Sequence, residues 1–276
     1  MGVVVSTAYA ISSAASTESW KPVIGWHNTV EVSTISATYE ISTNPASNLA
    51  NPATHSVWKS GSTSSGKLTV LFSDTDPMDY VALARHNFGT GAVVIDSIEA
   101  LDPGGDEGDD GDWTEVHAGA ILADDSPVLF RFNPTVCNGL RINYTPASTE
   151  PQAAVMYAGH LTVLPNGIPP GHRPINYART AEAQASISEQ GEFLGTIERT
   201  AGLSSNIEQK DLDKTWYETY MRDLALLGQR AYFFFAWSPL HSPLEVGYVH
   251  VTNNPQPSYN SDARVDIVFE IDGIAV

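Results

Sequence analysis

The chain of 276 residues has only one cysteine, Cys137. This excludes an intrachain disulfide and a thiolate metal cluster, because each needs at least two thiol groups. Val136 and Leu140 make the surroundings apolar, and no neighbouring base could activate the thiol. The sequence therefore indicates a buried, inert side chain.

Basic residues are also scarce: 14 Lys and Arg stand against 32 Asp and Glu, which gives a formal net charge of −18. Affinity for nucleic acids depends on Lys and Arg that neutralise phosphates. A surface of this charge repels a phosphate backbone, so direct binding to DNA or RNA is not expected.

The sequence lacks an apolar run of the roughly 20 residues that a membrane helix needs. The stretch from Met1 to Ala15 is rich in Ser and Ala, but it has no basic segment and polar residues interrupt it. It does not have the pattern of a secretory signal. We therefore expect synthesis and folding in a cytoplasm, without membrane insertion.

Catalytic motifs are missing as well. There is no Gly-x-Ser-x-Gly elbow, no His-Glu-x-x-His pair and no His cluster at metal spacing among the eight histidines. A carboxylate pair such as Asp213 and Glu218 has no meaning without geometry. The sequence predicts a protein that is not an enzyme.

The segment from Gly61 to Leu68 comes close to a phosphate-binding loop but breaks its pattern. The last position should be Ser or Thr to hold magnesium, and it is Leu68. Lys67 should open a helix, whereas the residues from Lys67 to Phe72 have the pattern of a strand. We predict a polar loop that leads into a strand.

What the chain does have is a hydrophobic fraction of 42%, enough for a sizeable core. Single cores usually stop growing near about 250 residues, so we predict two domains. Four Pro and two Gly between Leu164 and Pro174 indicate an extended connector. The predicted parts are leading strands or an arm at 1–36, a first domain at 37–165, a linker at 166–174 and a second domain at 175–276.

Short β-branched and aromatic runs between Gly, Pro, Asn and Asp turns predict strands almost throughout the first domain, and hence a β-sandwich. Strands are expected at Lys67 to Phe72, Tyr80 to Arg85, Val93 to Glu99, Trp113 to His117, Val128 to Phe132, Leu140 to Asn143 and Ala154 to Val163. The leading segment has strand character at Val3 to Ile11, Val23 to Trp26 and Val30 to Val32.

The second domain is predicted to be a smaller β-sandwich with one flanking helix. Its strands are expected at Ala183 to Ile187, Phe193 to Thr200, Ala231 to Trp237, Leu244 to Val251 and Arg264 to Ile274. The helix is expected from Asp211, as its cap, to Leu227, with Gly228 ending it. Its apolar stripe is Leu212, Trp216, Tyr220, Leu224 and Leu227.

The segment from Asp102 to Asp112 contains six carboxylates, and its glycines would let the backbone fold around an ion. Calcium prefers flexible loops of this kind, although the spacing does not fit an EF-hand. The alternative is a solvated hairpin tip without metal. The candidate calcium ligands, and the only cofactor site that the sequence suggests, are Asp106, Asp109, Asp110 and Asp112.

The run from Tyr232 to Trp237 is hydrophobic on both faces of a strand, so both faces must be covered. The cover is either the domain itself with its helix or a neighbouring subunit. The candidate residues for an oligomer interface are Phe233, Phe234, Phe235 and Trp237.

Several short motifs of the first domain follow one another in a characteristic order. They are Asn44-Pro45-Ala46-Ser47-Asn48-Leu49, Thr54-His55-Ser56-Val57-Trp58-Lys59-Ser60, Tyr80-Val81-Ala82-Leu83-Ala84-Arg85-His86-Asn87, Trp113-Thr114-Glu115-Val116 and Gly139-Leu140-Arg141-Ile142. This order resembles the discoidin-like, galactose-binding-like β-sandwich. The resemblance covers about half of the chain and implies a binding or adhesion module rather than a catalytic one.

This resemblance suggests two roles for four residues. His86 and Asn87 could hydrogen-bond a glycan while Trp58 or Trp113 stacks on it. Alternatively, the same side chains brace the loops and fill the sandwich. No loop matches a known sugar-site pattern.

A second resemblance joins this domain to the β-rich domain behind it. It rests on Gly191-Glu192-Phe193-Leu194-Gly195, on the aromatic run before Pro239, and on Val265-Asp266-Ile267-Val268-Phe269-Glu270-Ile271-Asp272-Gly273. The combination resembles structural proteins of bacteriophage tails and baseplates, similar to distal tail proteins.

This resemblance implies a virion component that connects the tail tube to the receptor-binding apparatus. Its expected partners are copies of itself in a ring, trimer or hexamer, other tail or baseplate proteins, and a host glycan. The alternative function is a stand-alone carbohydrate-binding module. That alternative predicts a monomer that binds sugar.

Overall fold

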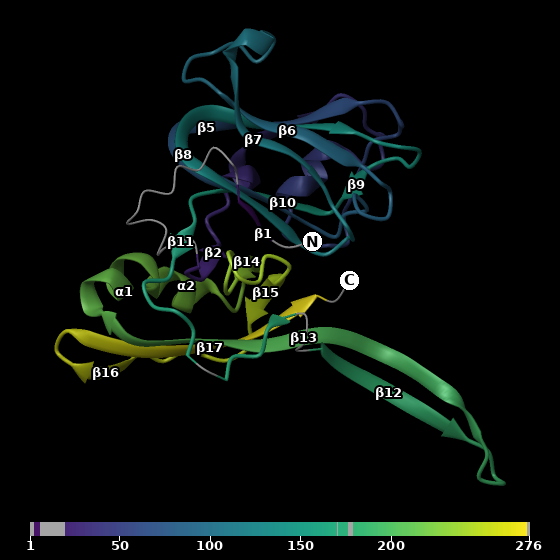
Figure 1. Ribbon diagram of the computed structural model, residues 1–276, viewed down its shortest axis with the longest axis vertical. Helices are drawn as coiled ribbons and strands as arrows, with labels where there is room; N and C mark the ends of the chain where they lie inside the picture. The colour runs from purple at the N-terminus through teal and green to yellow at the C-terminus, as the bar shows by residue number, and fades with distance from the viewer. Residues whose placement is uncertain (1–2, 6–19, 170, 176–178, 275–276) are drawn as a thin grey trace. The chain divides into compact units, whose positions relative to one another are not determined.

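The computed structural model describes residues 3–5, 20–169, 171–175 and 179–274 (Figure 1). The chain is mainly β, as predicted. It divides into two compact units. Unit 1 comprises Met1–Gly167 and Phe233–Val246, and unit 2 comprises Ile168–Tyr232 and Gly247–Val276. Among the described residues, no helix has the length and apolar character needed to cross a membrane.

Two long antiparallel strands, β5 (Gly66–Ala84) and β8 (Val128–Thr145), form the frame of unit 1. The first half of β5 lies between β8 and β3 (Thr34–Ala37), and its second half lies between β8 and β10 (Val155–Gly159). Register shifts in the middle of β5 separate the two halves. Because such shifts bend a strand, β5 and β8 curl and contribute to both layers of a sandwich (Figure 1).

Further strands complete the two layers. β6 (Val94–Leu101) pairs with β8 and with β7 (Trp113–Ile121), while β1 (Val3–Val5) runs parallel to the start of β8. Two separate strands were predicted within residues 67–85 and two within residues 128–143. This division is wrong, because each of these regions is one long strand, β5 and β8 respectively.

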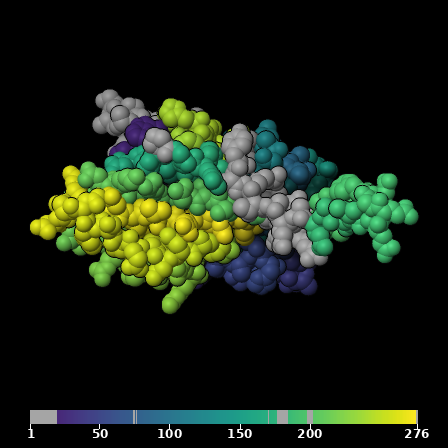
Figure 2. Space-filling view, turned by 90° about the horizontal axis from the view of Figure 1, so that it is seen from below, coloured from purple at the N-terminus to yellow at the C-terminus, as the bar shows by residue number. Residues whose placement is uncertain are grey.

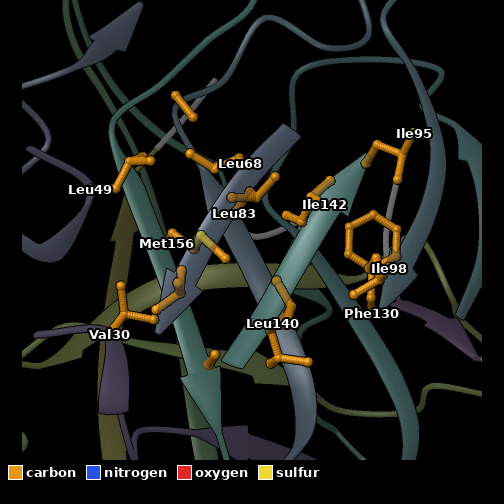
Figure 3. Close-up of a cluster of buried hydrophobic side chains, with 14 of the residues drawn as sticks. Val30, Leu49, Leu68, Leu83, Ile95, Ile98, Phe130, Leu140, Ile142 and Met156 are labelled. Atoms are coloured by element: carbon orange, nitrogen blue, oxygen red, sulfur yellow. The ribbon is translucent and has the colours of Figure 1, made fainter. Parts of the chain in front are cut away.

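The core of unit 1 lies between these layers and consists of alternating side chains of the strands. Figure 3 shows its labelled members pointing into one cluster. Trp58, Phe88, Phe130, Phe132 and Tyr144 are its largest buried side chains. Cys137 is buried here, and this burial raises the pKa of its thiol to about 11. The prediction of a buried thiol is confirmed.

Three short strands of unit 1 that are distant in the sequence pair with one another. β2 (Val23–Gly25) lies between β11 (Thr162–Val163) and β14 (Phe233–Ala236). A two-stranded pair, β4 (Trp58–Lys59) with β9 (Gln152–Ala153), lies elsewhere in this unit. Short 3-10 helices are η2 (Thr29–Val32), η3 (Ala46–Ala50) and η4 (Asp110–Asp112).

The strand expected at Val30 to Val32 is wrong, because these residues belong to η2. The side chain of Asn28 accepts a hydrogen bond from the Val30 amide at 3.2 Å. This cap satisfies a backbone donor at the start of the helical turn, which favours the turn over an extended strand.

Unit 2 is built on an antiparallel sheet in which β17 (Arg264–Ile274) and β13 (Phe193–Asp213) are the longest strands. β12 (Arg179–Ile187) pairs with β13 on its other side. β15 (Val246–Val251) and β16 (Ser258–Ser261) both pair with β17. The helix α1 (Lys214–Tyr220) contacts β13 and β17, and α2 (Arg222–Leu227) follows it.

The helix of this unit begins later than predicted and is broken in two. Leu212 and Asp213 pair with β17, so the strand holds residues that the periodicity assigns to a helix. Asp213, and not Asp211, is the cap, since its carboxylate accepts a hydrogen bond from the Trp216 amide at 3.0 Å. The buried stripe consists of Tyr217, Met221 and Leu224.

Candidate binding cleft

The two predicted sugar-stacking tryptophans are buried in unit 1. Trp58 lies edge-on to Tyr144 with 5.8 Å between the ring centroids. The indole N–H of Trp113 donates a hydrogen bond to the Glu107 carbonyl at 3.2 Å, and the Arg141 guanidinium lies 4.4 Å from the ring centroid. Neither side chain offers an open ring face to a sugar.

His86 is buried between two loops and its hydrogen bonds lie within the protein. Its Nε2 lies 2.9 Å from the Ser126 carbonyl oxygen, and its Nδ1 accepts a hydrogen bond from the Phe88 amide at 3.3 Å. Burial lowers the pKa of His86 to about 4. The ring is therefore neutral at pH 7, with Nε2 as the donor.

Asn87 connects the same loop to the segment before β9. Its amide donates to the Glu150 carbonyl at 3.0 Å, and its side-chain oxygen accepts from the Gln152 amide at 2.9 Å. Asp125, which the sequence analysis did not single out, accepts hydrogen bonds from the amides of Gly89 and Thr90, each at 2.9 Å. These side chains brace three loops of the sandwich.

Three of the predicted calcium ligands accept hydrogen bonds from backbone amides of the acidic loop. Asp106 and Asp109 each accept a hydrogen bond from the backbone amide two residues further on, at 2.9 Å. Asp112 accepts one from the Asp106 amide at 2.7 Å. Within the described part of the chain, no group of three or more His, Cys, Asp or Glu side chains could hold a metal ion.

Asp110, the fourth predicted ligand, belongs to an ionic network. It accepts hydrogen bonds from Lys67 at 2.7 Å and from Arg141 at 2.6 Å. Arg141 also forms an ion pair with Glu99. The hydrogen bond from Lys67, followed by that from Arg141, lowers the pKa of the Asp110 carboxyl. Lys67 lies in β5, which agrees with the rejection of a phosphate-binding loop.

The residues predicted for an oligomer interface belong to β14 and its continuation. Phe233, Phe234 and Phe235 are buried within the chain, and Trp237 is half-buried. Phe234 lies edge-on to Tyr157, with 5.4 Å between the ring centroids. The surroundings of the three phenylalanines are therefore those of a core strand.

A cleft of about 470 Å³ lies in unit 2, between the helices and the loop before β16. One wall is the exposed side of α1 and α2, and the other is the segment from Asn254 to Tyr259. Its lining residues are Tyr217, Glu218, Arg222, Ala225, Leu226, Gln229, Asn254, Pro255, Gln256, Pro257 and Tyr259.

The cleft combines one aromatic face with groups of both charges. Tyr259 is 52% exposed, and the Lys214 ammonium lies 5.7 Å from the centroid of its ring. Glu218 and Arg222 are exposed and four residues apart on the helical wall. Within the described residues, neither of these two side chains forms an ion pair, so each keeps hydrogen-bonding capacity for a ligand.

The loop wall of the cleft is stiff. Pro255 and Pro257 fix their φ angles and so restrict the segment around Gln256. The side-chain amide of Gln229 donates a hydrogen bond to the Asn253 carbonyl, which ties the loop to the end of α2. A wall that is already ordered loses little conformational entropy when a ligand binds.

Sequence analysis did not find this cleft. Glu218 was named only in a carboxylate pair with Asp213, and neither Arg222 nor the Asn-Pro-Gln-Pro segment was predicted to form a site. The two walls are about thirty residues apart in the sequence, and the pairing of β16 with β17 brings Tyr259 to its position. The Pro-rich segment beside an exposed tyrosine is the only local signal that could have indicated a site.

No family model matches the chain, and no curated protein matches it. Solved structures with some likeness include the chitosan-binding module 1 of a chitosanase/glucanase from Paenibacillus sp. IK-5. It is 16% identical, with a TM-score of 0.42 over 49% of this chain and 99% of that one. The family 32 carbohydrate-binding module of C. perfringens NanJ, solved in complex with galactose, is 16% identical, with a TM-score of 0.40 over 51% and 99%.

A third structure is the family 32 module of AlyQ in complex with 4,5-unsaturated mannuronic acid. It is 17% identical, with a TM-score of 0.38 over 46% of this chain and 94% of that one. At these values the likeness carries no argument about ligand or mechanism. The role in a phage tail stays a prediction, because neither the fold nor these structures test it.

Proposed function

We propose that this protein binds a saccharide without transforming it, and that the cleft of unit 2 is the binding site. The observation that carries the proposal is the chemistry of the cleft. An exposed tyrosine lines a space that is also lined by a guanidinium, a carboxylate and side-chain amides.

These groups match the two kinds of surface that a sugar ring presents. The apolar C–H face of a pyranose can lie on the ring of Tyr259, and aromatic contacts of this kind contribute roughly 0.5–1.5 kcal/mol. The hydroxyl groups can donate to Glu218 and accept from Arg222. Hydrogen bonds to charged groups contribute about 1.5–3 kcal/mol each.

An affinity in the range of about 0.1–1 mM follows for one sugar unit, because ordering the ligand offsets much of this gain. The rigid Pro255 and Pro257 wall reduces that cost. A longer oligosaccharide is expected to bind more tightly only where its further units also contact the cleft.

The experiment is a titration of the full chain with neutral, acidic and amino oligosaccharides, followed by isothermal calorimetry. Tyr259→Ala is expected to raise the dissociation constant of the best ligand about tenfold, which corresponds to about 1.4 kcal/mol of binding free energy. Tyr220→Ala is the matched control, because Tyr220 is similarly exposed on α1 but does not line the cleft.

Equal binding by both variants and the unchanged chain would place the sugar elsewhere. The absence of binding to every class of saccharide at millimolar concentration would overturn the proposed function itself.

A further inference from the structure

One end of unit 2 is a hairpin that extends beyond the rest of its sheet. β12 pairs with residues 193–203 of β13, whereas β17 pairs with β13 only from Gly202 onward. The hairpin from residue 184 to residue 197 is therefore a two-stranded ribbon, which reaches past the end of β17 in Figure 1. A two-stranded ribbon alone is marginally stable in water.

The end of this ribbon is apolar and exposed. Ile187, Phe193, Leu194 and Ile197 are 65–68% exposed. Figure 2 shows the end of the hairpin in green. Four such side chains present roughly 500 Å², a size at which an exposed apolar patch usually marks an interaction site.

The outer edge of the ribbon is also open. In the described sheet the strand order ends at β12, so one row of its backbone N–H and C=O groups has no neighbouring strand. Proteins commonly protect such edges with Lys or Pro. Residues 180–187, Thr-Ala-Glu-Ala-Gln-Ala-Ser-Ile, contain neither, and only Glu182 is charged.

We propose that the occupant of this edge is a second copy of the same chain, paired through two antiparallel β12 strands about a twofold axis. Identical edges are self-complementary in such a pairing. In the register that places Gln184 opposite Gln184 of the second copy, Glu182 is opposite Ser186. The one charged residue of the segment therefore does not face its own copy, and like charges are not brought into direct opposition.

The available area supports a weak dimer rather than a permanent one. Two ribbon ends together offer roughly 1,000 Å², the lower limit for a specific interface. Antiparallel pairing adds backbone hydrogen bonds and brings the apolar end of each ribbon beside the base of the other. We expect dissociation in the micromolar to millimolar range, so the dimer depends on protein concentration. This inference does not depend on the proposed saccharide site.

The test is sedimentation equilibrium of the full chain over a micromolar to millimolar concentration series. A monomer–dimer equilibrium is expected. Phe193→Ser combined with Leu194→Ser should raise the dissociation constant at least tenfold. Ile121→Ser is the matched control and should leave it unchanged, because Ile121 is similarly exposed but lies in unit 1.

A second variant tests the register independently of the apolar end. Gln184→Cys should give a disulfide-linked dimer under mild oxidation, because residue 184 lies beside the twofold axis and the native Cys137 is buried. A monomer at every concentration would overturn the proposal. A dimer that resists the double serine variant or does not cross-link through position 184 would overturn it as well.

Discussion

The two units of this chain differ in whether their polar and aromatic side chains are buried or exposed. In unit 1, Trp58 is buried, Asn87 has its hydrogen bonds inside the protein, and Asp125 binds two backbone amides. In unit 2, Tyr259 and Phe193 are exposed. In unit 1, residues of the types that often bind sugars have structural roles. In unit 2, residues that no sequence motif marked as a binding site are accessible to a ligand or partner.

Residue type alone therefore does not decide whether a side chain has a structural or a binding role. A sandwich with short loops has many buried backbone groups, and those groups need partners. His86 and Asn87 are used for this purpose. The ribbon and cleft of unit 2 have fewer neighbouring layers, so their side chains keep unsatisfied surface.

The sharpest contrast is expected between two phenylalanines. Phe130→Ala should lower the free energy of unfolding by about 4 kcal/mol, because it leaves a cavity in the core of unit 1. Phe193→Ala should change it by less than about 0.5 kcal/mol in the monomer, since the side chain is already exposed. Chemical denaturation at low protein concentration, followed by tryptophan fluorescence, measures both. Equal losses of unfolding free energy in the two variants would contradict the contrast between a buried phenylalanine in unit 1 and an exposed one in unit 2.

The next largest effect concerns pH. The unfolded chain binds a proton on His86 near pH 6.5, whereas the folded chain binds it only near its pKa of about 4. Stability is therefore fully present above about pH 6.5 and falls by about 3 kcal/mol as the pH decreases to about 4. Denaturation at a series of pH values should show this slope, and His86→Gln should reduce it. An unchanged slope in the variant would show that another group causes it.

His160 is expected to act in the opposite direction and more weakly. Its hydrogen bond with Asp79 raises its pKa, so it stabilises the fold below about pH 6.5 and loses that effect as the pH rises through the raised pKa. Its side chain is 57% exposed, and solvent screening keeps the contribution small. The pH dependence of the free energy of unfolding is measured for His160→Gln and subtracted from that of the unchanged chain. The difference is the contribution of His160, separate from that of His86.

Another contrast lies within one ionic network. Arg141→Gln should lower the free energy of unfolding by about 2 kcal/mol, because Glu99 then loses a charged partner in a mostly buried site. Lys67→Gln should cost less than about 0.5 kcal/mol, since its pair with Asp110 is exposed. Thermal unfolding of the two variants compares them directly, and a larger loss for Lys67→Gln would contradict this ranking.

Much of the strand pattern could be predicted from the sequence, including β17, whose bounds agree with the expectation. The continuity of β5 could not, because residues 73–77 contain Ser, Asp and Pro and have the pattern of a turn. Pro77 nevertheless pairs with Val136, between two register shifts that accommodate it. The start of the helix was missed because pairing with β17 extends β13 through Asp213.

The candidate site was less predictable than the fold. Whether Trp58 faces a ligand or the core depends on which layers cover it, and this is a tertiary property. The cleft needs two segments that only the folded sheet brings together. Periodicity can place Arg222 on a helix, but it cannot show that Tyr259 lies across a cleft from it.

The most direct test of saccharide binding in the cleft is an NMR titration of the isotope-labelled full chain with the best saccharide ligand. If the cleft binds the saccharide, the amide chemical shifts change at residues 217–229 and 254–259, while those of the loops around His86 stay constant. Changes confined to the loops of unit 1 would contradict the assignment of binding to the cleft.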